Sequence, residues 1–258
     1  MKEKEHKYGE HVHLVRDNMA TSRLTSLCDA RTPQSQVINL TQSLYAEVLL
    51  RAVVNLIFPT ITIKVSTPMA TIVGQRGRVQ AETIDPLTMV AIATLLRAGD
   101  IAAGACFGSL VSILSEGCVR QDFFGATRQT NTEHQVTGTE ISYIKKGSLD
   151  GRVLLIPDPM GATGGSIIKT LDCYGDGVGN VRAMATLHLI ITPEYIRRIT
   201  LAYPDLHIFA LRVDRGMSDD DILNTVPGTF PDREFGLTET QYIVPGAGDM
   251  GARLTGLP

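Results

Sequence analysis

The segment of residues 153–166, VLLIPDPMGATGGS, constrains the fold of this chain more than any other part of the sequence. Its first four residues are all apolar, which is typical of a strand that is buried on both faces of a sheet. Pro157 and Pro159 then end the hydrogen-bonded ladder, because proline has no amide N–H to donate. A helix is expected from residue 166 onward. A buried strand followed so soon by a helix predicts an α/β protein with a parallel sheet.

The loop between this strand and this helix has the chemistry of a sugar-phosphate site. Gly164 and Gly165 let the backbone approach a ligand closely. The first N–H groups of the helix have no partner within it, so they can bind a phosphate, and the hydroxyls of Thr163 and Ser166 add donors. The carboxylate of Asp158 suits the hydroxyls of a ribose or a metal ion. These groups predict a site for ribose 5-phosphate; the alternative is a plain glycine-rich connection capped by Ser166.

Two better-known phosphate-binding motifs do not fit the sequence. The loop has no lysine after its glycines, so it is not a Walker loop, and it does not match a dinucleotide fingerprint. The nearest match to that fingerprint, GDGVG at residues 175–179, follows the expected helix and precedes a strand. We interpret it as a helix C-cap and a turn.

The rest of the chain alternates between strand-like and helix-like segments. Pro59 ends one long helix, and Thr192 with Pro193 marks the beginning of another. In parallel sheets of this kind, ligands bind at the carboxyl ends of the strands. The expected strands are residues 60–65 (an edge strand), 89–96, 119–124, 141–144, 153–156, 181–191 and 206–213, a hairpin covers 68–82, and the expected helices are 39–58, 101–115, 166–174 and 192–203.

Composition and charge exclude several classes of protein. Lys and Arg number 24 against 27 Asp and Glu, a net charge of −3, so the chain lacks the basic surface of a nucleic-acid-binding protein. No two of the four cysteines have C-x-x-C spacing, which argues against a zinc site. Scattered cysteines in a chain of this length are typical of the reducing cytoplasm. The longest apolar stretch, residues 89–114, is interrupted by Arg97 and Asp100. We therefore expect a cytoplasmic protein without a membrane span.

Four motifs resemble, in the same order along the chain, those of the uracil phosphoribosyltransferase family. DPMGATGGS (158–166) is similar to that family's loop for 5-phosphoribosyl-1-diphosphate (PRPP). LLRAG (95–99) resembles its pyrophosphate-side loop, DRG (214–216) a motif after a later strand, and YIVPGAGDMGAR (242–253) its C-terminal uracil loop. The resemblance implies the α/β fold of a type I phosphoribosyltransferase, which is a parallel sheet flanked by helices with a small hood and a β flap.

We expect a single phosphoribosyltransferase domain over residues 1–258. Residues 1–36 are polar and irregular, which predicts an N-terminal arm with room for one short helix. Residues 125–140 are polar without an apolar period, which predicts a flexible flap. Residues 218–240 form a polar insertion, and residues 241–258 correspond to the uracil loop and hood.

The resemblance implies a pentosyltransferase reaction in pyrimidine salvage, in which uracil and PRPP give UMP and pyrophosphate with Mg²⁺ as cofactor. Asp158, Arg97 and Asp249 would be catalytic, and Asp249 would also approach the Mg²⁺, indirectly. The expected partners are these small substrates, with no nucleic acid and no membrane, in a homodimer or higher homo-oligomer with a possible role for GTP as effector. The residues implied to bind PRPP are Arg97, Arg128 (from the flap), Asp158, Pro159, Met160, Gly161, Ala162, Thr163, Gly164, Gly165, Ser166 and Asp249, and those implied to bind uracil are Ile243, Gly248, Asp249 and Met250.

The residues support part of this assignment without the resemblance. Arg97 follows a buried strand, at the edge of the sheet where ligands bind, and a guanidinium suits a pair of diphosphate oxygens. The alternative is an Arg97 paired with Asp100 or a helix end. The glycines and Pro245 of residues 242–253 expose backbone groups that can bind a pyrimidine edge. A plain surface turn is the alternative there.

The sequence also departs from the family pattern. Gly161 stands where a larger apolar residue is usual and is expected to loosen the loop, and Ala252 replaces an acidic residue. The insertion 218–240 carries an acidic run at 219–221 that we expect to be solvated. Two alternatives therefore stay open: a catalytically inactive or altered-specificity homologue that acts as a PRPP- or nucleotide-binding regulatory protein, and an RNA-binding regulator, against which the absence of a basic surface argues.

Overall fold

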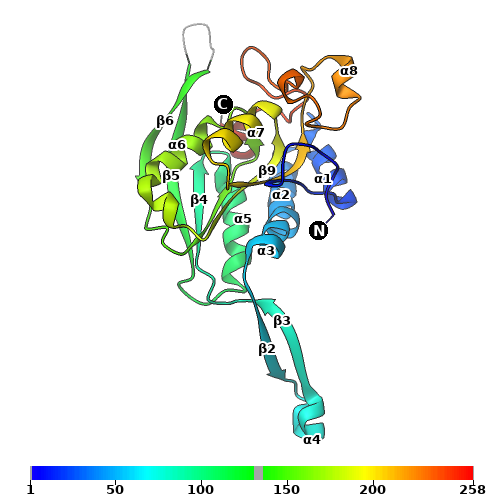
Figure 1. Cartoon of the computed structure of the whole chain (residues 1–258), viewed down its shortest axis with the longest axis vertical. Helices are drawn as coiled ribbons and strands as arrows, with labels where there is room; N and C mark the ends of the chain where they lie inside the picture. Colours follow the sequence, from blue (N-terminus) through cyan, green and yellow to red (C-terminus); the bar gives the residue numbers. More distant parts are fainter. Residues whose placement is uncertain (1, 131–135, 258) are drawn as a thin grey trace.

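The computed structural model describes residues 2–130 and 136–257, and its centre is a mostly parallel sheet of eight strands (Figure 1). The strand order is β1-β10-β9-β7-β4-β5-β6, with β8 alongside β9, and only β5 and β6 pair antiparallel. The predicted fold class is confirmed. The strands are β1 (Val12–Leu14), β4 (Val90–Leu96), β5 (Val119–Thr130), β6 (Val136–Lys145), β7 (Val153–Pro157), β8 (Met160–Gly161), β9 (Ala183–Ile191) and β10 (His207–Val213).

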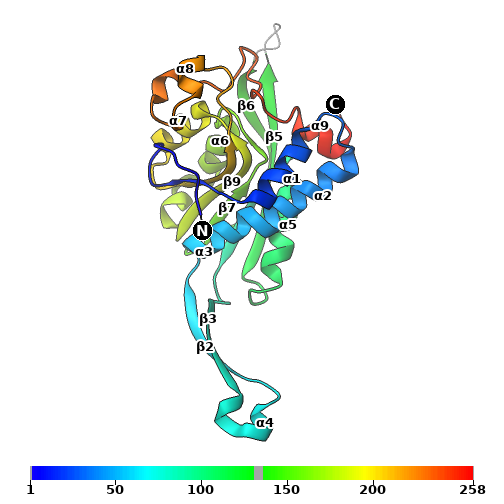
Figure 2. The ribbon, with the colours of Figure 1, turned by 90° about the vertical axis from the view of Figure 1, so that its right-hand side faces the viewer.

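Helices cover both faces of the sheet (Figures 1 and 2). Leu155 of β7 points into one layer of the core, and Leu154 and Ile156 point into the other. The continuous apolar run at 153–156 is therefore the result of burial on both faces. The first face carries α1 (Asn18–Cys28), α5 (Gly99–Val111), α9 (Met250–Thr255) and a long helix made of α2 (Gln34–Leu44), the π-helical turn η1 (Tyr45–Leu49) and α3 (Leu50–Ile57); the second carries α6 (Gly165–Tyr174) and α7 (Pro193–Ala202).

Several sequence signals have the predicted structural role. Thr192 caps α7 by accepting the N–H of Tyr195 at 3.0 Å, and Pro193 is the first helical residue. The GDGVG segment is a 3-10 turn, η3 (Gly175–Asn180), and Gly175 ends α6 with a φ of 58°. These residues therefore form the predicted helix end and turn.

Among the described residues, one continuous helix, Gln34–Ile57, is long and apolar enough by length and composition to cross a membrane. Half of its most apolar window is buried inside the protein. Leu44, Tyr45, Leu49 and Val53 are fully buried in the core beside the sheet. This is the pattern of a helix that packs on a sheet with one face.

The N-terminal segment differs from the irregular arm expected at 1–36. Val12–Leu14 form β1, a buried strand that pairs with β10. Helix α1 follows, and its N-cap Asp17 accepts the N–H of Ala20 at 2.7 Å. A strand of three residues is too short to show an alternation of apolar and polar residues in the sequence. Its partner β10 lies nearly 200 residues later in the chain, so the pairing could not be predicted from neighbouring residues.

Residues 60–84 form a hairpin arm that projects from the body (Figures 1 and 2). The strand predicted at 60–65 is present, but it pairs only with the other strand of the arm and is not an edge strand of the main sheet. The hairpin is also larger than the predicted 68–82. The arm contains β2 (Thr60–Ser66), α4 (Ala70–Val73), the 3-10 turn η2 (Gly74–Gly77) and β3 (Arg78–Ile84).

The segment expected to be a flap, 125–140, continues the strands on either side of it. Strand β5 runs to Thr130, and β6 begins at Val136 and includes the strand predicted at 141–144. Residues 131–135 lie outside the described part of the chain. The polar composition hid both strand extensions, because apolar alternation is the main sequence signal for a strand.

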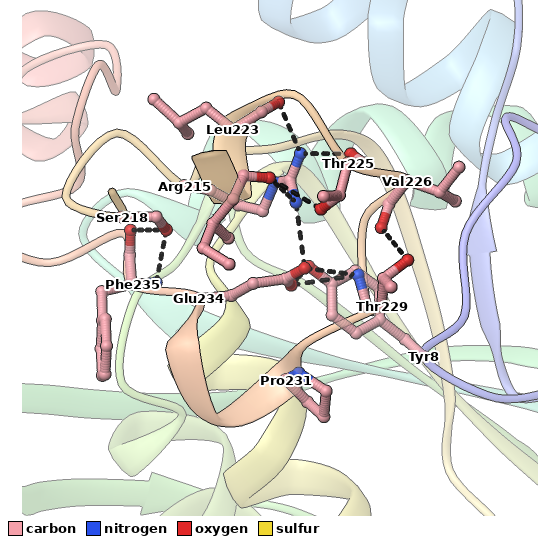
Figure 3. A network of polar contacts seen from close by, with 12 residues as sticks. Tyr8, Arg215, Ser218, Leu223, Thr225, Val226, Thr229, Pro231, Glu234 and Phe235 are labelled. Carbon is pink, nitrogen blue, oxygen red and sulfur yellow. Dashed lines mark hydrogen bonds and ion pairs between the residues drawn. The ribbon is translucent and has the colours of Figure 1, made fainter. Parts of the chain in front are cut away.

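The polar segment 218–240 packs beside the N-terminal segment (Figure 3). Its carboxylate Glu234 is fully buried and accepts from Arg215 Nη1 at 2.9 Å and from the N–H of Gly228 at 2.8 Å. The hydroxyl of Tyr8 donates to the same carboxylate, and burial followed by this contact raises the pKa of Tyr8. The segment contains α8 (Asp220–Leu223) and the 3-10 turn η4 (Pro231–Arg233).

The acidic run at 219–221 lies at the surface of this segment, as expected. Arg233 lies 3.4 Å from Asp219 and 2.9 Å from Asp221, and all three side chains are exposed. Exposed pairs of this kind contribute little to folding stability.

Candidate functional site

Strands β4 and β7 are parallel neighbours at the centre of the sheet, and a cavity of about 620 Å³ lies at their carboxyl ends. The chain leaves β4 through α5 to β5 on one side, and it leaves β7 through α6 to β9 on the other side. Such a switch point is where open α/β sheets bind their ligands. Arg97 follows β4 and Asp158 follows β7, and both line the cavity.

The peptide of Asp158 is held by buried groups beneath the loop. Its N–H donates to the carbonyl of Leu187 at 3.0 Å, which also accepts the hydroxyl of Tyr45 at 3.0 Å. The carbonyl of Asp158 lies 2.5 Å from Nδ1 of His188, so Nδ1 carries the proton. Nε2 then accepts from the hydroxyl of Tyr195 at 2.7 Å. These bonds fix the backbone from which the Asp158 side chain reaches the cavity.

Burial gives these supporting groups a single charge state. It lowers the pKa of His188 to about 3, so the imidazole is neutral at physiological pH. Burial also raises the pKa of Tyr45 and Tyr195, and the nearby Asp158 carboxylate adds to this effect in both. Both phenols are therefore protonated and able to donate.

Gly161 packs tightly against helix α7. A Cβ at this position would lie 2.8 Å from Cγ2 of Ile191 and 3.1 Å from the ring of Tyr195. The expectation that Gly161 loosens the loop is wrong, because the Tyr195 ring fills the space that a larger residue would take. The residue Thr192 adds a further tie by donating its hydroxyl to the carbonyl of Ala162 at 2.6 Å.

The loop leads directly into helix α6, and the first residues of this helix line the cavity. Gly164 has the left-handed backbone conformation, with φ at 76°, and α6 begins at Gly165. Arg198 of α7 donates to the carbonyl of Thr163 at 3.3 Å and holds the turn from behind. The N-terminus of α6, where the helix dipole favours a phosphate, therefore lies at the cavity, and the N–H of Gly165 donates to the hydroxyl of Thr163 at 3.4 Å.

Arg97 and Asp249 lie close together at the cavity. A Cβ placed on Gly251 would lie 3.1 Å from Oδ1 of Asp249 and 4.0 Å from Nη2 of Arg97. Asp249 also caps α9 by accepting the N–H of Ala252 at 3.0 Å. A guanidinium and a carboxylate side by side can hold a diphosphate, the first directly and the second through a cation.

The loop 242–253 is anchored by the DRG motif. Asp214, only 2% exposed, accepts the N–H of Gly246 at 2.7 Å and two bonds from Arg212 at 2.5 and 2.9 Å. The N–H of Gly216 donates to the carbonyl of Val244 at 2.9 Å. Asp214 therefore positions the loop backbone and does not line the cavity.

Most of the predicted site residues line this one cavity, although lining a cavity does not test what binds there. Pro159 is buried behind the loop, where its carbonyl accepts from Leu189 and Ile190. Arg128 belongs to β5, and its side chain lies outside what the structure describes. The predicted residues that line the cavity are Arg97, Asp158, Met160, Gly161, Ala162, Thr163, Gly164, Gly165, Ser166, Ile243, Gly248, Asp249 and Met250.

Further residues line the cavity that sequence reasoning did not assign to the site, among them Ser142, Tyr195 and Gln241. Ser142 lies in β6, in the stretch assigned only as a strand that closes the flap. Tyr195 follows the Thr-Pro cap at the carboxyl end of β9, a position where ligands are expected in a parallel sheet. Gln241 directly precedes the loop 242–253, and its adjacency to that loop was the available signal.

The Mg²⁺ predicted for this site would take several of its coordinating oxygens from the substrate and not from the protein. Within the described ranges, no group of three or more His, Cys, Asp or Glu side chains is arranged to hold a metal ion. Asp158 and Asp249 both line the cavity. Mg²⁺ commonly takes one or two carboxylates together with phosphate oxygens and water, so these residues fit it.

The fold and the site define a mostly parallel α/β protein with a glycine-rich loop and a helix N-terminus at the switch point of the sheet, an arrangement suited to phosphate. Comparison with protein families narrows this class. The family described as uracil phosphoribosyltransferase matches residues 14–236. The chain belongs to the uracil phosphoribosyltransferase family.

One similar solved structure supports the fold, and two weaker matches are given with it. The AQ2163 protein from Aquifex aeolicus superimposes with a TM-score of 0.72 at 20% identity, over 95% of this chain and 98% of that one. A hypoxanthine phosphoribosyltransferase from Trypanosoma cruzi gives 0.41 at 13% identity, over 73% and 82% of the two chains. One from Staphylococcus aureus gives 0.37 at 12% identity, over 49% and 62%. Family membership supports phosphoribosyl transfer from PRPP in nucleotide salvage, a pentosyltransferase reaction.

Proposed function

We propose that the protein is a uracil phosphoribosyltransferase that converts uracil and PRPP into UMP and pyrophosphate in the cytoplasm. The observation that carries this proposal is a shared cavity: Asp158, the N-terminus of α6 and the backbone of the loop 242–253 all line it. Ribose hydroxyls, a 5-phosphate and a flat base each need one of these three groups. The cavity of about 620 Å³ has room for such a ligand.

The chemistry is a substitution at C1 of the ribose. The bond from C1 to the diphosphate breaks with its electron pair on the leaving group, a bond forms from C1 to N1 of uracil, and the N1 proton is released. Arg97 would stabilise the charge on the diphosphate, and Asp158 would hold the ribose hydroxyls. When bound, Mg²⁺ supplies further positive charge to the diphosphate. The segment 125–140, with Arg128, would close over the site and exclude water.

The direct test is incubation with labelled uracil, PRPP and Mg²⁺, followed by separation of UMP. Asp158→Asn is expected to lower kcat by at least about 100-fold without unfolding the protein. Asp176→Asn is the matched control, because Asp176 is an exposed carboxylate on η3. Full activity in Asp158→Asn would remove Asp158 from the mechanism.

A second function, binding of PRPP or a nucleotide without turnover, is favoured by the segment 218–240 and by Ala252, which depart from the family pattern. Calorimetric binding of PRPP together with absence of UMP formation would support this regulatory reading. We further propose that the protein is a homo-oligomer. We also propose GTP as an effector, which a change in the initial rate on addition of GTP would support.

A further inference from the structure

Gln241 has a backbone conformation that normally belongs to glycine. Among the residues that the structure describes, it alone combines a side chain with a positive φ, 64°. It closes a short hairpin in which its N–H donates to the carbonyl of Thr238 at 2.8 Å, and the N–H of Thr238 donates to the carbonyl of Tyr242 at 2.9 Å. Leu237 and Ile243 pair across the hairpin. A turn followed by a left-handed residue is a common hairpin loop, and glycine is the usual residue at that last position.

A glutamine at this position therefore carries a conformational cost. A residue with a Cβ in the left-handed region is destabilised by about 1–2 kcal/mol relative to its preferred conformation. The hairpin geometry itself would be satisfied better by glycine. Residues held in such conformations gather at ligand sites, where the side chain has a role that offsets the cost.

The side chain of Gln241 has a ligand site to serve, because the residue lines the cavity together with Tyr242 and Ile243. It is the one carboxamide among the described lining residues. The guanidinium of Arg97 and the N-terminus of α6 suit phosphates, whereas Gln241 directly precedes the loop proposed for the base. A neutral carboxamide both donates and accepts, so it complements the N–H and C=O groups of a lactam edge.

We propose that Gln241 is a specificity-determining residue of the base pocket, which hydrogen-bonds the lactam edge of the pyrimidine. This inference rests on the proposed function, since it assigns the base end of the same cavity. A pocket that hydrogen-bonds a substrate group discriminates strongly against an analogue without that group. A glutamine at a turn position that favours glycine gives this chain a base contact made by a side chain in addition to the loop backbone.

The test is Gln241→Gly, which removes the side chain and relieves the strain at once. We expect the KM for uracil to rise about tenfold, the effect of one hydrogen bond, with the KM for PRPP unchanged and the melting temperature equal or higher. Gln241→Glu keeps the length and the strain but loses the N–H donor, and it should raise the KM for uracil as well. Glu239→Gly is the matched control, because Glu239 lies exposed in the same turn and does not line the cavity.

An unchanged KM for uracil in Gln241→Gly would overturn the proposal while the proposed function stands. If the wild type forms no UMP, the proposed function fails and Gln241 is judged by calorimetry instead. UMP should then bind about tenfold more weakly to Gln241→Gly, with ribose 5-phosphate binding equally to both proteins. Equal binding of UMP to both proteins would overturn the proposal in that case.

Discussion

His188 has both ring nitrogens engaged beneath the phosphate loop, and this limits the charge it can carry. A second proton would displace the bond from Tyr195 to Nε2. Burial lowers the pKa of His188 from 6.5 to about 3. Between these two values the unfolded chain binds a proton that the folded chain does not. The folded state therefore loses stability as pH falls below 6.5, and the loss continues to about pH 3.

As the pH is lowered, we expect the unfolding free energy of the wild type to decrease more steeply than that of His188→Asn. The two slopes should differ by up to about 1.4 kcal/mol per pH unit, because one proton is involved. Urea unfolding at a series of pH values below 6.5 measures both slopes. His207, whose pKa burial lowers to about 4, titrates in the same range, but it is present in both proteins. Parallel slopes would show that His188 does not carry this linkage.

A second prediction for a single residue concerns Gly161. Gly161→Ala should be overpacked against Ile191 and Tyr195 and lose about 1–3 kcal/mol of stability, with a higher KM for PRPP. Gly177→Ala is the control, because a Cβ there meets nothing within 4 Å. Thermal melting and steady-state kinetics of the pair decide it, and equal values for both variants would refute the packing argument.

At the scale of elements, the segment 218–240 supports the proposed base loop. The N–H of Val244 donates to the carbonyl of Gly236 at 2.8 Å, and the N–H of Gly236 donates to Glu194 of α7 at 2.9 Å. The loop thus rests on a segment that the buried Glu234 holds in place (Figure 3). A change in this segment should therefore weaken binding of the base much more than binding of the phosphate.

Glu234→Gln removes the charge opposite Arg215 and leaves a buried cation without its counter-ion. We expect a loss of about 3 kcal/mol of unfolding free energy and a KM that rises more for uracil than for PRPP. Arg233→Gln breaks an exposed pair in the same segment and should change stability by less than about 1 kcal/mol. If the two variants lose the same stability, the buried pair does not hold the segment.

Features of the fold and the site that depend on neighbouring residues could be predicted from the sequence, and features that depend on distant residues could not. The loop 153–166, the Thr192 cap and the alternation of strands with helices are local, and the sequence predicted them. Strand β1 depends on β10, and the support of Asp158 depends on Tyr45 and His188, which meet it only in the folded chain. The backbone conformation of Gln241 was also hidden, because glutamine is not a residue that predicts a left-handed turn.

At the scale of the whole molecule, the hairpin arm points away from the body at the end opposite to the insertion (Figures 1 and 2). Its two strands pair only with each other, and it exposes Val65, Met69, Ile72 and Val79. An isolated two-stranded hairpin is at best marginally stable in water, so an arm of this kind gains stability from a covering surface. Because oligomers of one chain are common, a second copy is the surface that we expect.

Ile72, 74% exposed at the tip of the arm, provides the test. We expect light scattering coupled to size exclusion to give the wild type a mass of at least two chains of 28.0 kDa, and Ile72→Glu a mass shifted toward one chain. Leu201→Glu on α7 is the matched control, because Leu201 is 86% exposed on the body and should leave the mass unchanged. A wild type that elutes as a single chain would contradict the oligomeric state, and an Ile72→Glu variant that keeps the wild-type mass would place the interface elsewhere than the arm.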